Sequence, residues 1–136
     1  MSQYITIEEL KTHAYNEQIS AIIREDEDIA LISIDIGILY AEGKLSKDYD
    51  TEEEFSKTGT DRHQLLVKYI KDIAIWELIG LSSPSIDYSD KKYRYELAIS
   101  WFDDVYNGMP VKLPRKKTNE SSSFKMTSNP KRQNYY

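Results

Sequence analysis

The most regular apolar pattern of the chain runs through residues 61–79, where large apolar side chains recur every three or four positions. That spacing places them on one face of an α-helix and predicts the central, most buried helix of the fold. We expect Asp61 to cap its N-terminus and Gly80 to end it. The stripe consists of Leu66, Ile70, Ile73 and Ile79, with Leu65, Tyr69 and Trp76 beside it.

A second apolar run extends from Ile29 to Tyr40 and fits two kinds of secondary structure. Its isoleucines alternate as in a strand and are β-branched, which favours a strand, yet they also follow helical spacing. The stretch 28–45 is long for a strand and ordinary for a helix, and four acids stand at its start. Gly43 near its end also suits a helix. We therefore expect a helix over residues 28–45.

The last apolar pattern predicts a helix that begins at Asp87 or Ser89 and ends at Asn107. An aromatic or aliphatic residue recurs there every four positions, and we expect this stripe to face the core. On this basis Tyr93 and Trp101 are interpreted as packing residues. The stripe consists of Tyr93, Leu97, Trp101 and Val105, flanked by Ala98 and Phe102.

Two shorter helices are expected near the start of the chain. Thr6 and Glu9 form a T-x-x-E capping box that begins the first, and residues 17–24 carry isoleucines at helical spacing and predict the second. The polar stretch 46–60 is interpreted as a loop with a helical turn at 52–55. Together these elements predict an all-α fold, a small antiparallel helical bundle of four to five helices with an extended C-terminal arm.

Charge divides the chain into an acidic body and a basic C-terminal segment. Residues 1–110 hold 22 acids and 11 bases, a net of −11, whereas residues 111–136 hold seven bases and one acid, a net of +6. The two values sum to the net charge of −5. We therefore divide the chain into a helical body, residues 1–109, and a basic arm, residues 110–136, whose polar composition does not fold alone.

The arm has the features of a peptide that docks on a partner protein. Its apolar and aromatic residues are interpreted as anchors, and its bases as electrostatic guides. A solvated, disordered terminus and a tail that binds nucleic acid are the alternatives. The predicted interface residues are Arg115, Lys116, Lys117, Phe124, Met126, Pro130, Lys131, Arg132, Tyr135 and Tyr136.

The sequence offers little catalytic or metal-binding equipment. It has no cysteine and two histidines, His13 and His63, which we interpret as surface or capping residues. The acidic stretch 48–59 lacks the glycine and the final acid of an EF-hand, so no calcium site is expected. No nucleophile motif, phosphate loop, secretory leader or membrane-length apolar run occurs. The sequence therefore predicts a soluble protein that is not an enzyme and has no cofactor, metal site or membrane contact.

Four segments carry a likeness to a known group of proteins: YITIEEL, IDIGILYAEGKL, LLVKYIKDIAIWELIG and KYRYELAISWFDDVYNGM. In order and spacing they resemble the small helical head–tail connector proteins of tailed bacteriophages, including the version found in Mu-like prophages. The likeness covers residues 4–109. The matching residues are Tyr4, Ile5, Thr6, Leu10, Asp72, Ile73, Ala74, Arg94, Tyr95, Glu96, Ala98, Trp101, Phe102 and Gly108.

This resemblance implies structural work in the virion. Connectors of this kind form a ring, usually of twelve copies, that docks under the portal protein, extends the DNA channel and helps to retain the genome. The ring also provides the attachment surface for tail or neck proteins, and packaged DNA passes through it without sequence-specific binding. In related connectors the C-terminal segment packs onto the portal or a neighbouring subunit. The expected location is the head–tail junction, after assembly in the bacterial host cytoplasm.

One acidic loop is a candidate for the lumen or for contact with the next ring. An acidic lining would repel the DNA backbone and let it slide, so we hypothesise that this loop faces the channel or the neighbouring ring. Another neck or tail-completion ring protein, or a small DNA-binding protein that uses the basic arm, are the alternatives to the connector interpretation. The loop acids are Asp48, Asp50, Glu52, Glu53 and Glu54.

Overall fold

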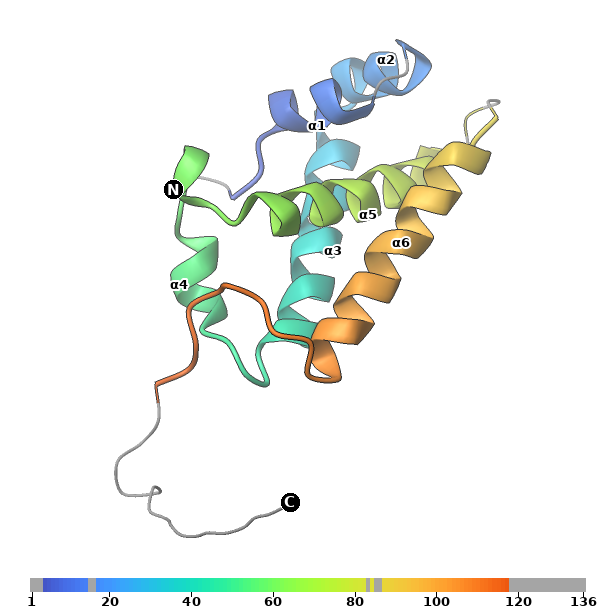
Figure 1. Ribbon diagram of the computed structural model, residues 1–136. Helices are drawn as coiled ribbons and strands as arrows, with labels where there is room; N and C mark the ends of the chain where they lie inside the picture. Colours follow the sequence, from blue (N-terminus) through green and yellow to red (C-terminus); the bar gives the residue numbers. More distant parts are fainter. Residues whose placement is uncertain (1–3, 15–16, 83, 85–86, 118–136) are drawn as a thin grey trace, which may run out of the picture.

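The computed structural model describes residues 4–14, 17–82, 84 and 87–117, and these residues form an all-α fold, as predicted. Within them there is no β-strand, and Tyr49 and Arg115 form one isolated antiparallel bridge. Six helices and a 3₁₀ turn pack together (Figure 1). They are α1 (Ile7–Ala14), α2 (Glu17–Glu25), α3 (Glu27–Leu45), α4 (Thr51–Phe55), the 3₁₀ turn η1 (Gly59–Asp61), α5 (Gln64–Ser82) and α6 (Ser89–Tyr106).

The long helix α5 lies at the centre of the fold, crossing in front of α3 and packing beside α6 (Figure 1). It carries more buried residues than any other described helix, which confirms that it is the central element. The short helices α1 and α2 pack at one end of α3, and α4 lies near its other end. All four residues of the predicted stripe are buried: Leu66, Ile70, Ile73 and Ile79.

The crossing of α3 and α5 depends on a glycine. A Cβ atom added to Gly37 would lie 3.0 Å from the backbone oxygen of Ile70 and 3.1 Å from its Cγ2 atom. Only a residue without a side chain lets the two backbones approach this closely. The other buried residues of α3 on this side include Ala30 and Ala41, whose small side chains extend the close contact.

The ambiguous run from Ile29 to Tyr40 is helical, as the length argument predicted. Asp26 caps α3 by accepting a hydrogen bond from the backbone N–H of Ile29 at 3.2 Å. Apolar residues occur on all sides of this helix, so the neighbouring helices cover only some of them. Ile34 is buried, whereas Ile32 is 51% exposed.

The predicted core stripe of α6 is wrong in part. Tyr93 is 60% exposed and Leu97 is 42% exposed, while Trp101 is half-buried against the ring of Tyr69 at a centroid distance of 5.1 Å. Four residues turn a helix by about 40° more than a full turn, so a strict four-residue repeat winds away from the core. The face that is buried follows mixed spacing instead, and consists of Lys91, Ala98, Phe102 and Val105.

The ends of α5 also differ from the sequence prediction. Asp61 belongs to η1, and the cap comes from His63, whose Nδ1 accepts a hydrogen bond from the N–H of Leu66 at 3.2 Å. Gly80 lies inside the helix, which continues to Ser82, because a helix end needs more than a glycine. His63 is thus a capping histidine, one of the two roles predicted for it.

We predict that Gly37→Val destabilises the fold by about 1–3 kcal/mol, because the new side chain has to displace the backbone of α5. The matched control is Gly80→Val, since Gly80 is also helical but has no atom within 4 Å of an added Cβ. It should change the free energy of unfolding by less than about 0.5 kcal/mol. Urea unfolding followed by circular dichroism measures both, and equal effects would contradict the close approach.

Candidate functional site

The first residues of the basic arm return to the body instead of leaving it. After α6 the chain turns at Gly108, whose φ of +111° lies in the region that favours glycine. The segment 109–117, here called the return segment, then crosses from the end of α6 to α4 (Figure 1). Leu113 is buried in the hydrophobic core on the way. The arm is therefore anchored before residue 118.

Backbone hydrogen bonds fix the return segment beside residues 48–50. The N–H of Asp50 donates to the carbonyl of Pro114 at 2.8 Å, and the N–H of Lys116 donates to the carbonyl of Asp48 at 3.2 Å. Between these bonds the Arg115 guanidinium lies 5.2 Å from the centre of the Tyr49 ring. The geometry is that of a short antiparallel pair, so the root of the arm has a defined place and direction.

The structure places only part of the predicted arm interface. Arg115 lies against Tyr49 of its own molecule, and Lys116 and Lys117 line an open cleft of about 420 Å³ with Ser46 and other residues at the start of α4. The side chains of these three bases therefore lie against the helical body of their own molecule. The remaining predicted arm residues lie outside the described residues: Phe124, Met126, Pro130, Lys131, Arg132, Tyr135 and Tyr136.

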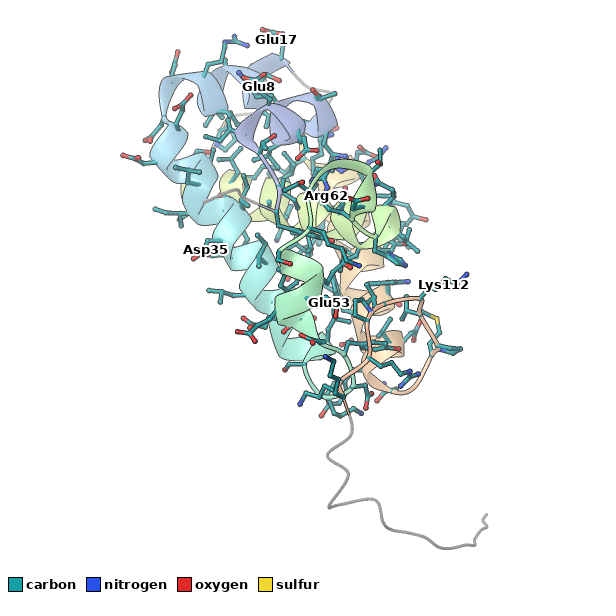
Figure 2. All side chains as sticks on the ribbon, turned by 90° about the vertical axis from the view of Figure 1, so that its left-hand side faces the viewer. Glu8, Glu17, Asp35, Glu53, Arg62 and Lys112 are labelled. Carbon is teal, nitrogen blue, oxygen red and sulfur yellow. The ribbon has the colours of Figure 1, made fainter. Side chains whose placement is uncertain are left out.

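The five acids of the candidate lumen loop have different environments. Asp50 caps α4 by accepting a hydrogen bond from the N–H of Glu53 at 3.0 Å. Glu52 and Glu53 are exposed, and Figure 2 shows Glu53 on the outer side of α4. Glu54 was expected to face the channel or the next ring, but its side chain is buried and hydrogen-bonded within the body. Thus Glu52 and Glu53, with the partly exposed Asp48, are the loop acids whose side chains are accessible at the surface of the described body.

Glu54 belongs to a buried polar cluster that sequence patterns did not reveal. Its Oε2 atom accepts hydrogen bonds from the Tyr4 hydroxyl at 2.5 Å and from the N–H of His63 at 2.8 Å. The guanidinium of Arg62 donates to the carbonyl of Tyr4 at 2.6 Å and to both carboxylate oxygens of Glu9, at 2.9 and 2.5 Å. Residues from α1, α4 and the start of α5 are thereby joined, with Arg62 between them (Figure 2).

The electrostatics of this cluster follow from its hydrogen bonds and burial. The bond from Arg62 lowers the pKa of Glu9 to about 2, so Glu9 is ionised at neutral pH. Burial, and next the bond to the Glu54 carboxylate, raise the pKa of Tyr4 far above its usual range. Burial lowers the pKa of His63. The cluster therefore holds the charges of Glu9 and Arg62 in fixed places, which is a structural role.

A second polar group lies between α1 and α5. The Nε2 atom of His13 is 2.6 Å from a carboxylate oxygen of Asp72, and Lys68 donates to the other oxygen at 3.3 Å. A shallow polar cleft of about 260 Å³ lies alongside, lined in part by His13 and by Lys71, whose pKa is lowered by burial. His13 thus lies within hydrogen-bond distance of a buried carboxylate and differs from the expected surface or capping residue. Among the described residues no group of three metal-ligating side chains occurs.

The chain matches no family model, no curated protein and no solved structure. Across the described residues, none of the helices has both the length and the apolar content that crossing a membrane requires.

Acid should weaken the fold through Glu9. A carboxyl whose folded-state pKa is about 2, below its ordinary 4.5, gives stability that is complete above pH 4.5 and is lost as the pH falls toward 2. We expect Glu9→Gln to flatten this loss by about 1–2 kcal/mol, allowing for the partial exposure of the pair. The control Glu8→Gln removes a charge that is 81% exposed on the same helix, and should keep the wild-type slope. Urea unfolding between pH 2 and pH 6 tests this, and identical slopes for Glu9→Gln and wild type would contradict it.

The contribution of the return segment to stability is also testable. A chain that ends at Lys117 keeps Leu113 and its neighbouring hydrogen bonds. A chain that ends at Pro110 loses them, and burial of one leucine is worth about 1.5–3 kcal/mol, or several degrees in melting temperature. Calorimetry of the three chains decides, and equal melting temperatures for both truncations would show that the return segment does not stabilise the fold.

Proposed function

We propose that this chain is a head–tail connector subunit of a tailed bacteriophage, a ring protein that docks beneath the portal and offers a surface to the tail. The observation that carries the proposal is the return segment, which fixes the root of a basic arm at one edge of an all-α body. The likeness of residues 4–109 to connector sequences supports the same role.

A fixed arm root suits attachment to a neighbouring protein. Because Lys116 is bonded to the body through Asp48, residues 118–136 begin at a defined point on the surface. An arm that starts beside its target binds at a high effective concentration, so a modest contact is enough. In a closed ring each contact recurs in every subunit, and weak contacts add up to stable attachment.

The exposed acids next to the arm root fit the same role. Glu52 and Glu53 lie on the outer side of α4, close to where Lys117 lines the neighbouring cleft. In this proposal they face the DNA channel or the next ring, where negative charge keeps the DNA backbone from adhering. Glu54 has no part in this, because it serves the buried cluster with Tyr4.

The decisive experiment measures particle mass by light scattering, for the full chain alone and mixed with the portal ring encoded in the same genome. We expect a complex of ring size with portal, and an at least tenfold weaker complex when the four apolar anchors of the arm are changed to serine, because they supply most of the contact energy. Tyr93→Ser is the matched control, since Tyr93 is an exposed aromatic residue on α6. The anchors are Phe124, Met126, Tyr135 and Tyr136.

Two results would count against the proposal. A chain that ignores portal and binds DNA with an affinity that falls steeply with salt favours the DNA-binding alternative. A serine variant that joins the portal as well as the wild type shows that the arm is not the docking element, even if the ring forms.

A further inference from the structure

The outer face of α3 is apolar and uncovered in the described part of the chain. This face lies away from Gly37, the residue at which α3 contacts α5. Ile32 is 51% exposed and Leu39 is 56% exposed, and Ile36 between them is half-buried. The spacing of three and four residues makes a continuous ridge, which is the pattern of a helix that packs against a further element. We call it the α3 ridge, comprising Ile29, Ile32, Ile36, Leu39 and Gly43.

An acidic row runs along one side of the α3 ridge. Asp28, Asp35 and Glu42 are spaced by seven residues, which returns them to nearly the same side of the helix. All three are exposed, and Figure 2 shows Asp35 at the outer edge of α3, away from the body. Within the described residues none of the three forms a salt bridge. This surface is therefore complementary to a partner that carries apolar groups and positive charge.

A second copy of α3 is not complementary to this surface in charge. If two α3 ridges packed antiparallel, each acidic row would face its own counterpart, and like charges in that position destabilise the pair. The opposite side of the ridge carries Tyr40 and Lys44, and Lys44 already pairs with Asp103 of α6 at 2.8 Å, so a parallel arrangement meets a base that is already paired. The charge pattern thus disfavours dimerisation through this face.

The chain itself contains a segment of the required chemistry. Residues 118–136, the distal arm, hold three bases and one acid, together with apolar and aromatic residues. Two of these bases, Lys125 and Arg132, are seven residues apart, which is about 23 Å in extended chain. The acidic row from Asp28 to Glu42 is about 21 Å long on the helix. The charges of the two segments are therefore matched in sign and in length.

The point where the distal arm begins is also favourable. Lys117 lines the same cleft as Ser46, the residue that follows α3, so the arm starts at the end of this helix. Glu42 lies only four residues back from Ser46, and an arm running from there toward Asp28 needs no long connection. Binding within one molecule then carries a small entropic cost.

We infer that the α3 ridge and its acidic row form the docking site for residues 118–136 of the same molecule. Apolar residues of the distal arm cover Ile32 and Leu39, and its bases pair with the acidic row. This contact is independent of the connector proposal, because it is made by the isolated chain.

Site-directed spin labelling of the full chain tests this contact, and the absence of cysteine makes a single label clean. A nitroxide on Ser128→Cys should broaden the NMR amide signals of α3 from Ile32 to Gly43. The outer side of α6 around Tyr93, whose exposure is similar, should be unaffected. When labelled protein without ¹⁵N is mixed with unlabelled ¹⁵N protein, no broadening should appear, because the contact is within one molecule.

Matched variants identify the groups responsible. Asp35→Asn with Glu42→Gln should abolish most of the broadening, and so should Ile32→Ser with Leu39→Ser. Glu96→Gln with Asp104→Asn removes the same charge from exposed positions of α6, and Tyr93→Ser with Leu97→Ser removes a similar exposed apolar pair from that helix, so both control proteins should behave as the wild type.

Three outcomes would overturn the inference: no broadening of α3, broadening that survives both α3 variants, or broadening only in the mixed sample, which would mean an exchange between molecules. None of these outcomes bears on portal binding, since no portal is present. Conversely, failure to bind portal leaves the labelling result unchanged.

Discussion

The arrangement of the helices depends on the close approach of α3 and α5 at Gly37. These two helices are the longest and most apolar described. Because Gly37 has no side chain, they approach so closely that an added Cβ atom would lie 3.0 Å from the Ile70 carbonyl oxygen. The other long helix, α6, packs against both, so its position follows from theirs. A wider spacing would open a gap between the two helices, and interiors of proteins tolerate such gaps poorly.

Around this apolar centre, polar contacts hold the short segments that bury too few apolar side chains to be stable alone. A helix of five residues such as α4 is not stable alone. Glu54 ties it to Tyr4 and to the start of α5, while Asp50 ties its other end to Pro114 in the return segment. The polar cluster and the arm root therefore share one task, and the arm begins at a rigid place because α4 is held from both sides.

The sequence predicted those features that depend on local patterns. The helices, the capping box of Thr6 and Glu9, and the buried face of α5 follow from spacing and capping chemistry, and the structure confirms them. It could not predict contacts between residues far apart in the chain. Nothing near Arg62 indicates that Glu9, 53 positions away, is its partner, and the four-residue repeat of Tyr93 misled because packing selected another face of α6. The return of the arm depends on Leu113, one apolar residue in a basic stretch, too weak a signal to be recognised alone.

The two proposals make the distal arm serve two surfaces, and this has a thermodynamic consequence. While the arm covers the α3 ridge of its own molecule, it is not available to another protein, so the apparent affinity for a partner falls in proportion to the fraction of molecules whose arm is free. Salt weakens the pairing of Asp35 and Glu42 with the arm, because exposed charges are screened, and so it releases the arm. Release also uncovers Ile32 and Leu39, so the arm and the α3 ridge become available to partner proteins at the same time. If both proposals hold, the subunit stays self-contained in solution and exposes both surfaces once a partner competes successfully for the arm, which is the behaviour that ordered assembly of a proposed ring on a portal requires.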